Sequence, residues 1–180
     1  VLGVDINAHA VDSINAGKPH ISEPDLDVLV RRVVSKGSLR ASLMPEPADA
    51  FILAVPTPFC DDHQPDTSCI QAACARIPHQ KGELSDIRIA HCPERVLPGQ
   101  ILREVVHNAR IIGGLTRKCA QAAMQLYKLF VQGECHLTTA RTAEMAKLTE
   151  NAFRDINIAF ANELSMICDR LKIDVWSLIR

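Results

Sequence analysis

Short continuous apolar runs alternate along this chain with longer stretches in which apolar residues recur every three or four positions. Continuous runs are typical of strands buried in a sheet, and they occur at 1–6, 39–42, 50–55, 87–91, 110–113 and 135–138. The helical period predicts helices at 8–16, 25–36, 67–77, 101–107, 116–130, 142–171 and 174–180. The clearest strand is Ala50-Phe-Ile-Leu-Ala-Val55, because it is apolar throughout and ends at Pro56-Thr-Pro58, which cannot continue a ladder.

The order of these segments predicts the fold class. Strands that alternate with helices form a parallel α/β sheet, whose ligands bind at the carboxyl ends of the strands. The helix over 142–171 does not belong to that alternation and indicates the start of a second structural unit. We therefore expect a Rossmann-type parallel sheet in residues 1–138, followed by a long central helical region in residues 139–180.

Composition narrows the class of protein. Of the 180 residues, 47% are hydrophobic and 23% are charged, which is enough apolar surface for an ordinary core and argues against disorder. The 20 Lys and Arg residues are interspersed with 21 Asp and Glu residues, so neither a nucleic acid nor a membrane surface is expected as a partner. No apolar run is long enough to span a bilayer, and residues 1–6 lack the basic region of a secretion signal, so we expect a cytoplasmic protein.

The spacing of cysteines and histidines indicates whether the chain forms disulfides or binds a metal. The seven cysteines form no Cys-x-x-Cys pair, which favours reduced thiols over a disulfide framework. The seven histidines show no metal-ligand spacing, so no metal site is expected.

Two predicted strand ends carry candidate cofactor-binding residues. Asp5 ends the first strand, where an acidic residue of a dinucleotide-binding unit accepts hydrogen bonds from ribose hydroxyls. The alternative is an ordinary acidic turn residue. Val55, Pro56 and Thr57 place a stiff turn and a hydroxyl at the carboxyl edge of the sheet. The alternative for them is a simple strand terminator.

Two further segments carry candidate catalytic groups. Glu94 and Arg95 follow another strand and lie between two prolines, although a solvated surface pair would look the same in the sequence. In the helix over 143–163, Lys147 and Asn151 lie one turn apart on a polar stripe. The rest of that helix is so apolar that we expect it to be largely buried, with an ammonium and an amide directed at one developing oxyanion. The alternative is an exposed, salt-bridged amphipathic helix.

Five blocks in this order resemble the nucleotide-sugar 6-dehydrogenase family, that is, the UDP-glucose/GDP-mannose dehydrogenases. They are Val4-Asp-Ile-Asn7, Ala54-Val-Pro-Thr-Pro58, Cys92-Pro-Glu-Arg-Val-Leu-Pro-Gly99, Arg110-Ile-Ile-Gly-Gly114 and the segment 143–163. The third and fifth blocks are most similar to the UDP-N-acetyl-D-mannosamine dehydrogenase branch. A UDP-glucose 6-dehydrogenase, a non-catalytic paralogue that only binds or dimerises, and another Rossmann dehydrogenase acting on a hydroxy acid are the alternatives.

This resemblance implies a four-electron, NAD-dependent oxidation of UDP-N-acetyl-D-mannosamine to the uronate, for bacterial surface polysaccharide of the enterobacterial common antigen kind. It implies a homodimer formed through the helix over 142–171, and a further UDP-binding domain after it. Asp5, Val55, Pro56 and Thr57 would contact NAD. The residues that would act in catalysis are Glu94, Lys147 and Asn151, and those that would contact the substrate are Arg95, Val96, Leu97, Lys147 and Asn151.

Three parts of the family pattern are not among the 180 residues. The glycine-rich loop would precede Val1, a strand with a Thr-Ser-Pro turn would lie between Leu84 and Ser85, and the segment with the nucleophilic cysteine would follow Arg180. None of the seven cysteines lies in that last context, so we expect this chain alone to be inactive. The missing first strand would pair with both 1–6 and 51–55, and we expect these two segments to need other residues in that position.

Overall fold

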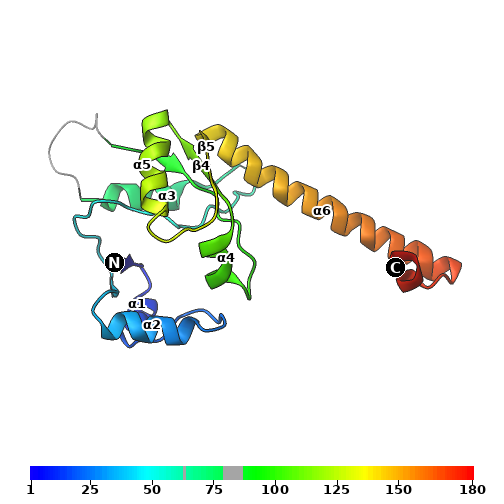
Figure 1. Ribbon diagram of the computed structural model, residues 1–180, viewed down its shortest axis with the longest axis horizontal. Helices are drawn as coiled ribbons and strands as arrows, with labels where there is room; N and C mark the ends of the chain where they lie inside the picture. The colour runs from blue at the N-terminus through cyan, green and yellow to red at the C-terminus, as the bar shows by residue number, and fades with distance from the viewer. Residues whose placement is uncertain (63, 79–86) are drawn as a thin grey trace. The chain divides into compact units, whose positions relative to one another are not determined.

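The computed structural model describes residues 1–62, 64–78 and 87–180 (Figure 1), and it divides into two compact units, Val1–Asp86 and Ile87–Arg180. In the first unit, β1 and β2 form a two-stranded parallel sheet. The elements of this unit are β1 (Leu2–Val4), α1 (Ala8–Asn15), α2 (Leu26–Ser35), β2 (Arg40–Ser42) and α3 (Ser68–Arg76).

Local sequence signals explain how β1, α1 and β2 fit together. The Asn7 side chain accepts a 3.0 Å hydrogen bond from the His9 amide and so caps α1. Gly17, at a φ of 75°, ends that helix in the left-handed region. The Asn15 side chain then bonds both backbone groups of Ala41, at 3.0 and 2.8 Å, which fixes α1 on the edge of β2.

The strand predicted at 50–55 is wrong: these residues are extended but belong to no ladder in the part of the chain that the structure describes. Their apolar side chains are exposed, with Ile52 at 63% and Leu53 at 44%. A buried strand requires a neighbour on each side for its amides and carbonyls. In the predicted strand order that neighbour is the first strand of the fold, which is not among the 180 residues.

The second unit holds a three-stranded sheet in the order β3-β4-β5. β5 runs parallel to β4 as predicted, whereas β3 runs antiparallel to it, which corrects the expectation of a fully parallel sheet. Two strands run parallel when the helix that joins them packs across the sheet. The helix that joins β3 to β4 is α4, whereas the helices that pack on β4 are α5 and α6. The elements of this unit are β3 (Ala90–His91), α4 (Ile101–His107), β4 (Arg110–Gly114), α5 (Arg117–Tyr127), β5 (Cys135–Thr139), α6 (Ala140–Leu171) and α7 (Val175–Ile179).

Two glycines let α5 and α6 pack closely on β4. A Cβ atom added to Gly113 would lie 2.6 Å from the Ala143 Cβ of α6, and one added to Gly114 would lie 2.3 Å from the Ala120 nitrogen of α5. Ile112, Ala120 and Ala143 are buried, with exposed fractions of 0 to 2%. The Gly-Gly pair of the fourth sequence block is therefore a packing requirement of this core.

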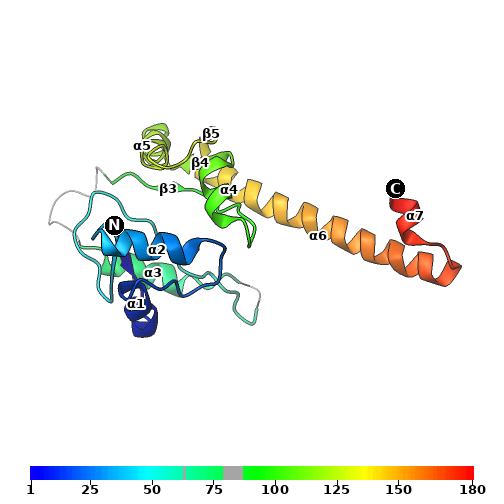
Figure 2. The same ribbon diagram turned by 60° about the horizontal axis from the view of Figure 1, so that its bottom comes forward.

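The long helix α6 has 32 residues and begins at Ala140, two residues before its predicted start, because Thr139 caps it by accepting from the Thr142 amide. Figures 1 and 2 show its first turns against the sheet and the rest extending beyond it. The expectation that this helix is largely buried is wrong for the chain alone, since no described element covers its middle. The large apolar side chains that it exposes include Met145, Leu148, Phe153, Ile156, Ile158 and Phe160.

The end of α6 and the helix after it follow their predicted signals. Lys172 adopts a left-handed φ of 54° and ends α6, and Asp174 caps α7 by accepting from the Trp176 amide. No helix in the three described ranges is both long and apolar enough to cross a membrane.

Candidate functional site

Asp5 lies directly after β1, at the carboxyl end of a parallel pair of strands. Its amide donates to the Ser42 carbonyl of β2 at 3.3 Å, and its Oδ1 accepts from the Asn7 amide at 2.8 Å. The side chain is exposed, so its carboxylate is accessible to a ligand at this edge. The arrangement fits a carboxylate that accepts hydrogen bonds from a ribose diol.

Val55, Pro56 and Thr57 do not end a strand, since the segment before them is unpaired. Val55 is half-buried, and Pro56 and Thr57 are exposed. They lie in the same compact unit as Asp5, but no hydrogen bond of the described residues ties their side chains to it.

The loop that carries Glu94 is anchored by two carboxylates, one from the loop itself and one from α4. Glu94 Oε1 accepts a hydrogen bond from the Val96 amide, and Glu104 Oε2 of α4 accepts one from the Leu97 amide at 2.7 Å. Pro93 is buried, Val96 is half-buried, and Glu94 and Leu97 are exposed. The exposed Glu94 carboxylate is therefore presented by a loop whose backbone is held at the two positions after Arg95.

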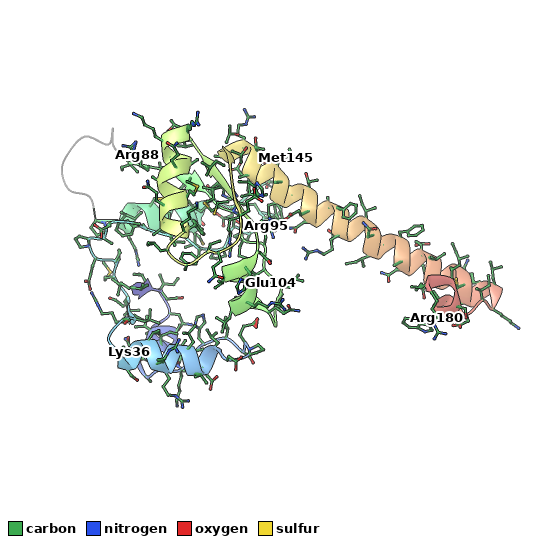
Figure 3. All side chains as sticks on the ribbon, in the orientation of Figure 1. Lys36, Arg88, Arg95, Glu104, Met145 and Arg180 are labelled. Carbon is green, nitrogen blue, oxygen red and sulfur yellow. The ribbon has the colours of Figure 1, made fainter. Side chains whose placement is uncertain are left out.

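Arg95 joins this loop to the long helix. Its Nε donates to Glu150 Oε2 at 2.9 Å, its Nη2 donates to Glu150 Oε1, and its Nη1 donates to the Ala109 carbonyl at 3.1 Å. Figure 3 shows Arg95 in the region between Glu104 of α4 and Met145 of α6. The alternative of a solvated Glu94–Arg95 surface pair is thereby corrected: Arg95 pairs with a residue 55 positions away, and the pair is partly buried.

Lys147 and Asn151 lie one turn apart on α6, on either side of Glu150 in the sequence. Lys147 is half-buried and Asn151 is exposed. Among the described residues neither side chain has a hydrogen-bond or ion-pair partner, so both donors are available to a ligand. The structure thus brings the Glu94 loop and the Lys147–Asn151 turn into one unit through Glu150, a residue that the sequence did not single out.

Arg110 is a buried charged residue that the sequence alone did not reveal. Arg110, at 7% exposure, opens β4, donates to the Val105 carbonyl at 3.0 Å and lies 5.9 Å from the centre of the Tyr127 ring. Its Nε has no partner within the described structure. Burial raises the pKa of Tyr127 to about 12, and the Cys92 thiol next to it adds to this shift.

Cys92 belongs to the same cluster. Burial raises the pKa of its thiol, and the Tyr127 hydroxyl and the Arg110 charge oppose that shift only in part. A thiol with a raised pKa is a poor nucleophile at neutral pH. The position of Cys92 beside Glu94 in the sequence therefore does not make it the nucleophile.

Comparison with known proteins identifies the relatives of this chain. Residues 1–81 and 77–131 match the NAD binding domain of the UDP-glucose/GDP-mannose dehydrogenase family, and residues 141–180 match its central domain. The chain is 58% identical to an "NDP-N-acetyl-D-galactosaminuronic acid dehydrogenase" of Ralstonia nicotianae, with 99% of this chain and 51% of the relative covered. It is 55% identical to a "UDP-N-acetyl-D-mannosamine dehydrogenase" of Campylobacter jejuni, with 100% and 54% covered.

Solved structures agree with these sequence matches. The native structure of a UDP-N-acetyl-mannosamine dehydrogenase from Staphylococcus aureus superposes with a TM-score of 0.85 at 44% identity, covering 99% of this chain and 51% of that one. The UDP-D-ManNAc dehydrogenase from Pyrococcus horikoshii superposes with a TM-score of 0.87 at 34% identity, with 99% and 50% covered. The chain therefore spans about half the length of the relatives that it matches.

The matches also bear on the predicted interruption between Leu84 and Ser85, which lies outside the described residues. The alignment with the Ralstonia relative is 216 residues long, more than the 180 residues of this chain, so the relative carries residues that have no counterpart here. The NAD-binding match falls in two parts, which overlap at 77–81. Both findings indicate that this chain lacks an internal segment of the family pattern near this point.

Proposed function

Because this chain belongs to the UDP-glucose/GDP-mannose dehydrogenase family, we propose that it supplies part of the active site of an enzyme that oxidises the C6 alcohol of a UDP-sugar to a carboxylate with NAD. The observation that carries the proposal is the attachment of the Glu94 loop to the helix that bears Lys147 and Asn151. This attachment places a carboxylate in one compact unit with two donors that have no partner among the described residues.

The proposed roles follow from the chemistry of the exposed groups. Oxidation of an alcohol and hydrolysis of an acyl intermediate both pass through negatively charged oxygen, which the Lys147 ammonium and the Asn151 amide stabilise. The Glu94 carboxylate orients or activates water. Val96 and Leu97 contact the sugar from the same loop, whereas Arg95, with its guanidinium already bonded to Glu150, contributes to substrate binding by shaping that loop.

The first unit contains part of the residues that an NAD site needs. The exposed Asp5 carboxylate at the end of β1 suits the adenosine ribose. We also assign Val55, Pro56 and Thr57, which belong to the same compact unit, to contacts with the cofactor. The glycine-rich loop for the pyrophosphate is not among the 180 residues. When bound, NAD accepts hydride from C6 of the sugar.

The proposed substrate is UDP-N-acetyl-D-mannosamine, and the product is the uronate used in bacterial surface polysaccharide. Relatives named for this sugar are 48 to 55% identical over the whole chain. The 58% identical relative named for an N-acetyl-galactosaminuronic acid makes a galactosamine derivative the second candidate. Both are 2-acetamido sugars, which favours this class over UDP-glucose.

The proposal extends to domains, assembly and location. We assign residues 1–138 to a partial NAD-binding domain and 139–180 to a central helical region that precedes a UDP-binding domain. The exposed apolar side chains along α6 support a homodimer through this helix. Seven free cysteines suit the reducing conditions of the cytoplasm.

The proposal is tested by the amount of NADH formed for each UDP-sugar consumed. The full-length protein containing this chain is purified and supplied with NAD and one UDP-sugar at a time, and NADH is followed by absorbance. We expect two NADH for each UDP-N-acetyl-D-mannosamine and slower or no turnover of UDP-N-acetyl-galactosamine and UDP-glucose. Failure with every UDP-sugar would overturn the proposal, and faster turnover of the galactosamine sugar would select the second candidate.

A further inference from the structure

We infer that the Arg95–Glu150 ion pair is a positioning pair, which holds the Glu94 loop on α6 and prevents Glu150 from capturing Lys147. The inference rests on the proposed function, because it concerns the residues assigned to that site. It assigns a role to Glu150, which otherwise lies unexplained between the two proposed donors of α6.

The geometry of Arg95 supports the first half of this role. Three of its nitrogens are engaged, two by the Glu150 carboxylate and one by the Ala109 carbonyl. A bidentate guanidinium–carboxylate pair fixes orientation as well as distance. The pair therefore ties together the Glu94 loop, the residue before β4 and the third turn of α6, all within one compact unit.

Sequence spacing on α6 supports the second half. Lys147 and Glu150 are three residues apart, and oppositely charged side chains at that spacing form ion pairs along a helix. In this structure they do not pair, and both oxygens of Glu150 are bonded to Arg95 instead. Lys147 is left without a partner among the described residues, which is the state that oxyanion stabilisation requires.

Partial burial makes the loss of one member of this pair more costly than in an exposed surface pair. The side chains of Arg95 and Glu150 are 28% and 37% exposed. Removing only one member leaves a partly buried charge that must find a new partner. Once Arg95 is removed, the cations within reach of Glu150 along α6 are Lys147, three residues before it, and Arg154, four residues after it. Each pairing of Glu150 with Lys147 removes the free ammonium from the site, in addition to the loosening of the loop.

The experiment compares single and double variants in the full-length protein. Arg95→Met should lower kcat about 100-fold, the scale expected for a catalytic group displaced by about 1 Å, with a smaller change in KM. Arg95→Met/Glu150→Met replaces the pair by two apolar side chains of similar size, frees Lys147 again, and should regain at least about tenfold in kcat. Glu150→Gln alone, which keeps the shape of the side chain, should lower kcat less than Arg95→Met.

A matched control is available in the first unit. Arg40 and Glu46 also form a bidentate pair, with side chains 57% and 47% exposed. Arg40→Met and Arg40→Met/Glu46→Met should leave kcat unchanged. Circular dichroism and thermal melting of every variant establish that it is folded.

A second measurement does not depend on turnover. The rate at which an amine-reactive acylating reagent modifies Lys147 at one fixed pH is followed by peptide mass spectrometry. Arg95→Met should slow this modification, and the double variant should restore its rate. If the double variant is as slow as Arg95→Met in both measurements, or if Arg95→Met behaves as wild type, the inference is wrong. An inactive wild type with the expected labelling pattern would instead refute only the proposed function.

Discussion

Replacing Gly113 with alanine tests whether the close approach of β4 and α6 builds the site. The added Cβ would lie 2.6 Å from the Ala143 Cβ, 2.6 Å from the Thr139 carbonyl oxygen and 2.8 Å from the Ala140 Cα. Two of these atoms are backbone and cannot rotate away. Since ordinary contacts between carbon atoms begin near about 3.5 Å, the first turn of α6 must move by about 1 Å.

The expected cost follows from that displacement. Overpacking of a buried site costs about 3 kcal/mol when rigid atoms must move, whereas the lower chain entropy of alanine in the unfolded state offsets under about 1 kcal/mol. A protein about twice as long as this chain loses about 1 °C per kcal/mol, so we expect its unfolding midpoint to fall by about 2 to 3 °C. Because the same movement displaces Lys147, kcat should fall as well.

The matched control is Gly3→Ala. Gly3 is also a strand glycine, in β1, but the nearest atom to its added Cβ is the Arg40 carbonyl oxygen at 3.9 Å. Differential scanning fluorimetry and NADH assays are run on both variants. A Gly113→Ala protein that melts within about 1 °C of Gly3→Ala, which is less than the expected shift, with normal kcat, would refute the packing argument.

Three further predictions concern the site, the buried cluster and the exposed helix. Lys147→Ala should lower kcat by about 10²- to 10³-fold while sedimentation shows an unchanged oligomer; near-normal turnover would make Lys147 a structural residue. Burial raises the pKa of Tyr127 from its ordinary value near 10 to about 12, so its neutral form favours the folded state below pH 10, and this contribution is lost as the pH rises through 12. Urea unfolding at pH 9 to 12 should therefore show a smaller fall in unfolding free energy for Tyr127→Phe than for wild type, and parallel curves would contradict the shift. Ile156→Asp, at a side chain 68% exposed on α6, should convert a dimer to monomer in sedimentation without lowering the melting temperature of the monomeric unit; an unchanged dimer would exclude this part of the helix as the interface.

Local signals were sufficient to predict most helices and their ends. Thr116 caps α5 and Asp174 caps α7 as expected, because these contacts involve residues within three positions of one another. The strand at 50–55 and the buried state of α6 were predicted wrongly for one shared reason. Both expectations depend on apolar surfaces that must lie against other residues, and no described residue of this chain covers them.

The candidate site residues could be named from the sequence, and their roles stay predictions, whereas their partners in the structure could not be named. Glu94, Lys147 and Asn151 were recognisable from residue type, spacing and resemblance, and the structure leaves all three open to a ligand. The partner of Arg95 was not recognisable, because no spacing rule links positions 55 residues apart. Arg110 was missed because a charged residue at the start of a strand is normally exposed, whereas here it lies over the Tyr127 ring.

Because α6 is long, a small change where its first turn packs on Gly113 moves its far end by several ångströms. A helix of 32 residues is about 48 Å long, and only its first turns touch β4. A tilt of about 5° at Gly113 would therefore move its far end by about 4 Å, which follows from that length. If two copies of α6 meet along their exposed faces, each copy restrains the tilt of the other, and the angle at which Lys147 meets its ligand becomes a property of the pair of helices.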